Sequence, residues 1–194
     1  PPVITIISPE NKIYGSSSIW ANISLNEPGS WAAYSLDGQP NVSLASADQF
    51  NWSKLMTGLT EGQHNITFWA NDTAGNMNHT GYVYFTVDTS LPIITLVAPT
   101  PENNGHVNRN WVYINATVQD DTAVDACWLE LNGTNYTMTK EGSGSSVICW
   151  FNATNLLDNL YVGRVWANDT VGNAGSSETR WIWIDTTPPT ITII

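Results

Sequence analysis

An internal repeat constrains the fold of this 194-residue chain more than any other feature. The segment Pro2-Val-Ile-Thr-Ile-Ile-Ser-Pro9 returns as Pro92-Ile-Ile-Thr-Leu-Val-Ala-Pro99, and Trp69-Ala-Asn-Asp-Thr-Ala-Gly-Asn76 returns as Trp166-Ala-Asn-Asp-Thr-Val-Gly-Asn173. The copies are offset by 90 and 97 residues, which is the size of a small domain. We therefore expect two tandem domains, at residues 1–90 and 91–187. Residues 188–194 restart the pattern, as the first strand of a following repeat or, alternatively, as a strand donated to a neighbouring subunit.

Each copy is predicted to contain about seven short strands, and no window shows helical periodicity. Alternation in the sixth strand predicts that Ile66, Phe68 and Ala70 face inward while Asn65, Thr67 and Trp69 face outward. This pattern is typical of an all-β fold with two tandem immunoglobulin-like antiparallel β-sandwich domains, and a single larger barrel is the alternative. The strands of the first copy are expected near Val3–Ser8, Ile19–Leu25, Trp31–Leu36, Asn41–Ala45, Phe50–Met56, His64–Ala70 and Gly81–Val87.

The charge of the chain excludes one large class of partner. Seventeen acidic residues against six basic ones give a net charge of -11. Nucleic acids are bound through Lys and Arg, which displace counterions from phosphates, and six scattered bases form no such track. No run approaches the ~20 apolar residues that cross a bilayer, so we expect no membrane span in this segment.

Four motifs give the chain a resemblance to a known group of proteins. They are the opening Pro1–Thr5, the strand endings Leu36-Asp-Gly38 and Leu131-Asn-Gly133, the turn from Leu59 to His64, and the loops Ala70–Asn76 and Ala167–Asn173. In these motifs the chain resembles the immunoglobulin-like tandem repeats of bacterial and archaeal cell-surface proteins. The second copy departs from the pattern in one turn, where Leu156 to Tyr161 replaces the Gly and His. The resemblance implies a spacer, an adhesin, a surface layer or a filament, and the fold alone selects none of these.

Potential N-glycosylation sites are the most specific chemical signal. Eleven of the 21 asparagines stand in Asn-x-Ser/Thr sequons, where chance would place about four. Strand alternation points several of them outward, where a glycan fits. The alternative is that Asn and Thr are simply common on polar β-surfaces. The predicted glycosylation sites are Asn22, Asn41, Asn51, Asn65, Asn71, Asn78, Asn115, Asn132, Asn135, Asn152 and Asn168.

Alternation places both cysteines inside the second domain. Cys127 shares a face with Leu129, and Cys149 shares a face with Val147, in the third and fifth strands of the expected sandwich. Those strands belong to opposite sheets, so we predict a disulfide between the sheets; two buried free thiols are the alternative. The aligned residues of the first copy are Ala32 and Trp52.

Aromatic residues form the third signal, because ten tryptophans exceed what two small cores need. Rings predicted to point outward mark contact surfaces, either between subunits or with sugars. A strand assigned one residue out of register would instead send them into the core. The interface candidates are Trp69, Tyr82, Tyr84, Trp128, Trp166, Trp181 and Trp183.

Acidic residues and histidines carry weaker signals. Oxygen ligands for calcium are available at loops and junctions, although no EF-hand spacing is present, and solvated turns are the competing explanation. We find no metal-ligand spacing, nucleophile motif or phosphate loop, so we expect no catalytic residues, no cofactor and no enzyme activity. The acidic residues concerned are Asp72, Asp88, Asp120, Asp121, Asp125, Asp169 and Asp185.

Three functions fit these observations. The first is a structural component of an N-glycosylated, extracellular, archaeal-type cell-surface assembly, namely a filament, sheath or surface layer. Its partners are N-linked glycans and further copies of the chain or adjoining repeats. The second is an adhesin or carbohydrate-binding module that uses the exposed aromatic faces. The third is a passive spacer within a larger surface enzyme.

Overall fold

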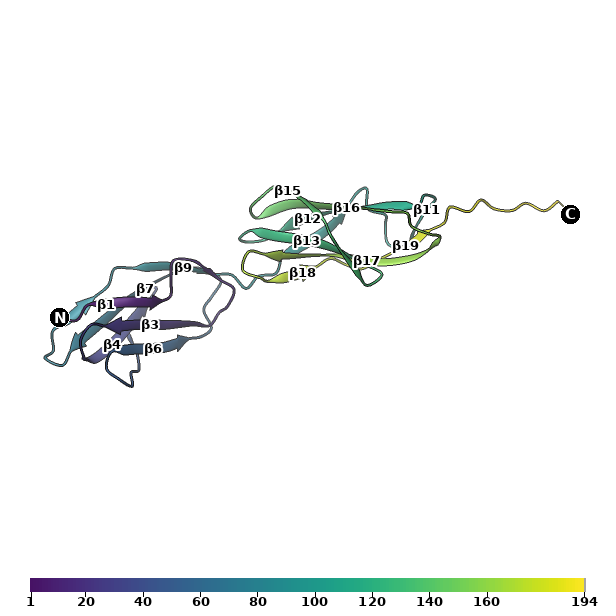
Figure 1. Ribbon diagram of the computed structural model, residues 1–194. Helices are drawn as coiled ribbons and strands as arrows, with labels where there is room; N and C mark the ends of the chain where they lie inside the picture. The colour runs from purple at the N-terminus through teal and green to yellow at the C-terminus, as the bar shows by residue number, and fades with distance from the viewer. Residues whose placement is uncertain (194) are drawn as a thin grey trace. The chain divides into compact units, whose positions relative to one another are not determined.

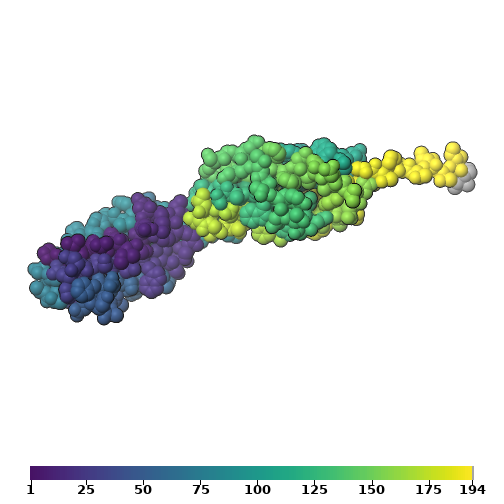
Figure 2. Space-filling view, viewed as in Figure 1, coloured from purple at the N-terminus to yellow at the C-terminus, as the bar shows by residue number. Residues whose placement is uncertain are grey.

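The computed structural model describes residues 1–193 and is built from β-strands (Figure 1). The chain divides into two compact units, residues 1–89 and 90–194. Figure 2 shows their surfaces, purple to teal for the first unit and green to yellow for the second. Each unit is a β-sandwich with its own core, which confirms the predicted fold class and excludes a single larger barrel.

The first unit packs a three-stranded sheet against a six-stranded one. The smaller sheet has the order β1-β3-β6, and the larger has the order β2-β9-β7-β4-β5 with β8 beside β7. This is the strand arrangement of an immunoglobulin-type sandwich. Its strands are β1 Ile4–Ser8, β2 Ile13–Tyr14, β3 Ile19–Leu25, β4 Gly29–Leu36, β5 Val42–Ser43, β6 Asn51–Met56, β7 Gly62–Asp72, β8 Met77–His79 and β9 Val83–Val87.

The second unit repeats this topology and adds one strand. Its sheets have the orders β10-β12-β16-β15 and β11-β19-β17-β13-β14, with β18 beside β17. The added strand is β15, which lies at the edge of the four-stranded sheet. The strands are β10 Ile93–Val97, β11 Gly105–Val107, β12 Trp111–Gln119, β13 Val124–Leu131, β14 Thr134–Thr137, β15 Thr139–Glu141, β16 Ser146–Thr154, β17 Asn159–Asp169, β18 Ala174–Ser176 and β19 Arg180–Ile184.

The cores follow the alternation of the strands. In β7, Ile66, Phe68 and Ala70 are fully buried, as predicted, while Asn65 and Trp69 are half-buried on the other face. Burial of a side chain as large as Phe68 contributes about 1.5–3 kcal/mol relative to its exposure. The period of two therefore fixes which face of each sheet meets solvent.

One prediction in β7 needs correction, because Thr67 is 8% exposed. Its hydroxyl donates to the carbonyl oxygen of Thr80 at 2.9 Å, so the segment after β8 covers it. Alternation assigns a face but cannot reveal a short segment that lies over that face.

The Leu-Asp-Gly and Leu-Asn-Gly motifs are hairpin turns. Asp37 and Gly38 both have positive φ, 50° and 70°, and Asn132 and Gly133 have 49° and 78°. Positive φ at two successive positions is the type I′ geometry, which matches the twist of the flanking strands and favours Asn-Gly or Asp-Gly. The second turn joins the paired residues Leu131 and Thr134 directly and so sets the register of β13 with β14, whereas one extra residue between the first turn and β5 shifts the pairing of β4 with β5 by one position.

Residues 188–193 form no strand in the structure. The predicted strand at 188–194 is therefore not observed in its described part, and Ile194 lies outside the described residues. A strand needs a neighbour to supply its hydrogen bonds, and none is present for this segment among residues 1–193.

Candidate functional sites on the outer sheet faces

The two cysteines form a disulfide across the second sandwich, as predicted. Cys127 on β13 and Cys149 on β16 are both buried and lie in different sheets. The alternative of two free thiols is therefore wrong. In the first unit the aligned Ala32 and Trp52 are buried in one core cluster, so a small and a large side chain occupy the positions of the cystine.

None of the eleven sequon asparagines is buried, and each of the four sheets carries at least two of them. This placement agrees with the predicted outward direction; attachment of sugar stays a prediction. The exposed asparagines are Asn41, Asn51, Asn132, Asn135 and Asn152, and the half-buried ones are Asn22, Asn65, Asn71, Asn78, Asn115 and Asn168.

Hydrogen bonds divide the sequon amides into three groups, of which Asn71 and Asn132 form the third, because they use only Oδ1, accepting from the Ser30 hydroxyl and the Val162 N–H respectively. In the first group the Nδ2 atom, to which a sugar would be attached, already donates to a protein oxygen. These engaged amides are Asn51 with Asp48, Asn78 with the Pro2 carbonyl, Asn115 with the Ala98 carbonyl and Asn168 with Asp125. In the second group the side chain makes no hydrogen bond within residues 1–193, so the amide is less hindered. On strands this group consists of Asn22, Asn65, Asn135 and Asn152.

Stacked indoles occupy the outer face of the sheet β11-β19-β17-β13-β14 in the second unit. Trp128 on β13 and Trp166 on β17 face each other across the ladder, with ring centroids 6.4 Å apart and planes 5° apart. The Arg164 guanidinium lies 4.4 Å from the Trp166 ring, a cation–π contact. Glu130 accepts hydrogen bonds from the Trp166 indole and from Arg164, both at 2.9 Å, and these bonds lower the pKa of Glu130.

The other predicted contact rings also lie outside the cores. Trp181 and Trp183 on β19 are each 40% exposed, and Trp183 stacks on His106. In the first unit Tyr82 and Tyr84 are about half exposed. The remaining predicted ring, Trp69, is half-buried beneath His79. The alternative in which these rings fill the core is therefore wrong.

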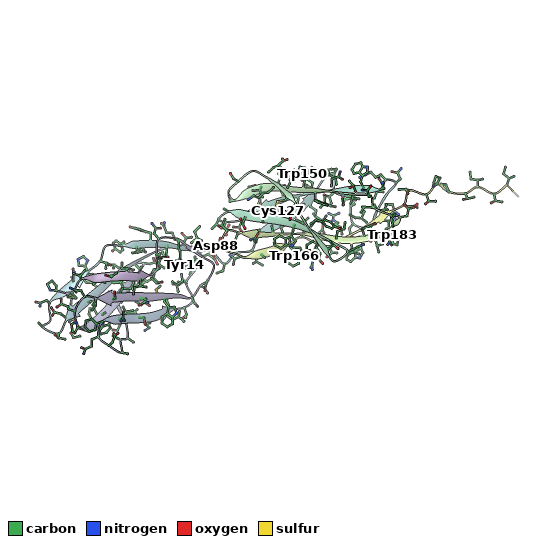
Figure 3. The ribbon with its side chains drawn as sticks, viewed as in Figure 1. Tyr14, Asp88, Cys127, Trp150, Trp166 and Trp183 are labelled. Carbon is green, nitrogen blue, oxygen red and sulfur yellow. A yellow bond between two sulfur atoms is a disulfide. The ribbon has the colours of Figure 1, made fainter. Side chains whose placement is uncertain are left out.

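A second aromatic surface, which the sequence analysis does not anticipate, lies on the four-stranded sheet of the second unit. Tyr113 on β12 stacks on Trp150 of β16, with ring centroids 5.5 Å apart and planes 14° apart. Arg109 covers Trp111, and the Trp150 indole donates to Glu141 at 2.8 Å. Figure 3 labels Trp150 and Trp166 on opposite sides of this unit, with Cys127 between them. The alternation of inner and outer residues in β12 and β16 indicates that these rings point outward.

The Asn-Asp-Thr-x-Gly-Asn loops are held by their own carboxylates. Asp169 Oδ1 accepts from the backbone N–H groups of Val171, Gly172 and Asn173, and its Oδ2 accepts from the Asn173 amide at 2.7 Å. In the first unit the Asp72 carboxylate accepts from the backbone N–H groups of Ala74 and Asn76 and from the Asn76 amide. These hydrogen bonds lower the pKa of Asp72, and the bond from the Asn76 amide has the largest effect. The repeated motif is thus explained by the geometry of a turn.

His64 occupies a buried site at the start of β7. Its ring nitrogens lie 2.7 Å from Asp37 Oδ2 and 2.8 Å from the Thr60 carbonyl oxygen. Burial alone lowers the pKa of His64, but the Asp37 hydrogen bond, the Thr60 carbonyl and the Asp37 charge together outweigh it, so the pKa is raised. In the second unit Tyr161 takes this place, and its hydroxyl accepts a hydrogen bond from the backbone of Leu157.

Several of the acidic residues bond to backbone and side-chain groups of their own loops. Asp72 and Asp169 have structural roles in their loops, and Asp185 accepts from the Thr187 backbone N–H. Within the second unit, carboxylate oxygens of Asp120 and Asp169 lie within 4.8 Å of one another. Calcium binding and the expected lack of catalysis and cofactors stay predictions. No helix within residues 1–193 has the length and apolar character needed to cross a membrane.

Comparisons with known proteins find similarity in fold. No protein-family model matches the chain, and no curated protein matches it. The fibronectin(III)-like modules of Clostridium thermocellum CbhA match over 94% of each chain, with 19% identity and a TM-score of 0.49. A 1.5-MDa bacterial ice-binding adhesin matches over 96% of this chain and 66% of that one, with 18% identity and a TM-score of 0.48. The Streptococcus agalactiae BspA C-terminal domain matches over 94% and 100%, with 11% identity and a TM-score of 0.42. At these identities the similarity concerns the fold alone.

Proposed function

We propose that the chain is a structural part of an extracellular, N-glycosylated cell-surface assembly, a filament, sheath or surface layer of archaeal type built from tandem immunoglobulin-like domains. One observation carries the proposal: all eleven sequon asparagines lie outside the cores, and nine of them are spread over all four sheets. Glycans at such sites would cover both sandwiches on every side.

Two further observations support this function. The disulfide fits an oxidising, extracellular compartment. Charged residues make up only 12% of the chain, and a glycan coat would add polar surface. Copies of the chain or adjoining repeats are the proposed protein partners.

Mass mapping of glycopeptides from the native material, combined with electron microscopy, tests this function. We expect sugar on most of the exposed sequon asparagines and an ordered polymer or layer. Asparagines outside sequons, such as Asn26 and Asn103, are the internal control. Unmodified sequons would contradict the glycan coat, and monodisperse particles would contradict the assembly and favour the passive spacer.

A carbohydrate-binding adhesin is a second candidate, supported by the exposed indoles of β19. Two rings on one strand, each 40% exposed, offer apolar faces to a sugar chain. Glycan-array binding that is lost on Trp181→Ala or Trp183→Ala, but kept on Trp20→Ala in the other unit, would favour this function. Absence of binding to any glycan would remove it.

A further inference from the structure

The exposed aromatic residues and the sequons are linked by position. Five of the eleven sequon asparagines have an aromatic residue two positions earlier, whereas none of the ten other asparagines does. With 11% aromatic residues in the chain, composition alone gives about one such case among eleven. The five pairs are Trp20 with Asn22, Trp69 with Asn71, Tyr113 with Asn115, Trp150 with Asn152, and Trp166 with Asn168.

All five pairs lie within strands, so the spacing of two residues places each ring close to its asparagine. Each pair belongs to one of β3, β7, β12, β16 or β17. Residues two apart on a strand point to the same face and are about 6.6 Å apart along it. None of the ten side chains is buried, so ring and amide share an outer face. The first sugar of a glycan on the asparagine is then within reach of the ring.

We propose that these outer aromatic residues are seats on which the first sugar of the chain's own N-linked glycan packs; the inference rests on the glycosylation proposed above. The C–H groups on one face of a pyranose ring carry partial positive charge, and the face of an aromatic ring is negative, so the two attract as they leave water. The occupant is covalently tethered, so packing costs little additional entropy.

Asn152 is the best-formed of the five sites. Trp150 precedes it by two residues on β16, and Tyr113 lies directly opposite it on β12. Trp111 lies opposite Thr154, the last residue of the sequon. Directly opposed residues of an antiparallel pair have Cβ atoms about 4.5–5.5 Å apart and diagonal neighbours lie about 7–8 Å apart, so the Tyr113 ring lies beside this amide and the Trp111 ring is the next nearest on the facing strand.

The rings around Asn152 are already fixed before a sugar arrives. Trp150 is held by its hydrogen bond to Glu141 and by stacking on Tyr113. Arg109 lies 4.3 Å from the Trp111 ring. Fixed rings lose little side-chain freedom when a sugar packs on them, which favours the contact.

Asn115 lies on the same sheet as Asn152 and provides a comparison for it. It lies opposite Trp150 and follows Tyr113 by two residues, but its Nδ2 donates to the Ala98 carbonyl and its Oδ1 is buried. Its amide is therefore less available than that of Asn152, and we expect lower glycan occupancy there.

The test uses the full 194-residue chain, glycosylated in its native host or in another N-glycosylating cell. Thermal unfolding is measured for the wild type, Asn152→Gln, Trp150→Leu and the double variant. We expect Asn152→Gln to lower the Tm of the second unit by about 4 °C or more when Trp150 is present, and by much less when Trp150→Leu is already in place. Asn135→Gln is the matched control, because Gly133 occupies the position two residues before that sequon.

A second measurement does not depend on stability. Protons of the first sugar on Asn152 are expected to show ring-current shifts in NMR spectra, and Trp150→Leu should reduce them, while the sugar on Asn135 should lack them. If a glycan is present on Asn152 but the Tm values show no coupling with Trp150 and the NMR spectra show no ring-current shifts, the proposed packing of the sugar on Trp150 is wrong. The proposed glycan coat is not affected by that result. An unmodified Asn152 overturns the seat at this site, and unmodified sequons throughout overturn the proposed function as well.

Discussion

The disulfide gives the sharpest test of how the second sandwich is stabilised. It joins residues 22 positions apart. In the chain-entropy treatment, closing a loop of this length removes about 11 cal/mol/K from the unfolded chain, or about 3.4 kcal/mol at 25 °C. The variant Cys127→Ala/Cys149→Ala should lose at least this amount, since both sulfurs are also buried.

Urea unfolding is monitored by hydrogen exchange and mass spectrometry, which reports the unfolding of each unit separately through its own peptides. The transition of the second unit should move to lower urea by the stated free energy, and that of the first unit should stay in place. Each single variant also breaks the cross-link, so the single and double variants should unfold at nearly the same urea concentration. Additive single effects would assign the loss to packing instead. A loss below about 1 kcal/mol in the double variant would refute the chain-entropy reasoning.

Two further predictions concern the polar sites. Because the pKa of His64 is raised in the folded state, its stabilisation is complete below the ordinary value of 6.5 and is lost as pH rises through the folded pKa. Unfolding of the first unit should therefore show a fall in stability over that window, which His64→Gln removes; an unchanged profile in the variant would contradict this. Asp169→Ala should destabilise the second unit by about 2–4 kcal/mol, because three backbone N–H groups lose their acceptor. Asp125→Ala is its exposed control, and equal urea midpoints for the two variants would refute the role of the Asp169 carboxylate.

The sequence predicts the long strands well and the short ones poorly. The expected strand Ile19–Leu25 has the bounds of β3, because four alternating apolar residues define its inner face. The strands β2 and β8, of two and three residues, have no counterpart among the expected strands. Strands so short hold no full period of alternation, and they form because β9 and β7 offer backbone hydrogen-bond partners.

The candidate sites are predicted unevenly for a related reason. Inner and outer positions follow from alternation, so the cystine lies inside and the seven contact rings lie outside the cores, as expected. The pairing of Tyr113 with Trp150 depends on the register of β12 with β16, which the sequence does not state. The contact between His64 and Asp37 likewise joins residues 27 positions apart through the β4–β7 ladder.

The parallel pairing of β2 with β9, and of β11 with β19, has a mechanical consequence. In each unit the earlier strand follows the first strand of the sandwich, and it pairs with the last strand before the chain leaves the fold. Tension applied to the two ends of a unit pulls these neighbours in opposite directions along their length. The bonds from Thr86 to Lys12 and from Asp88 to Tyr14 then carry the load together rather than opening one by one. Parallel pairing of this kind therefore resists stretching by shear.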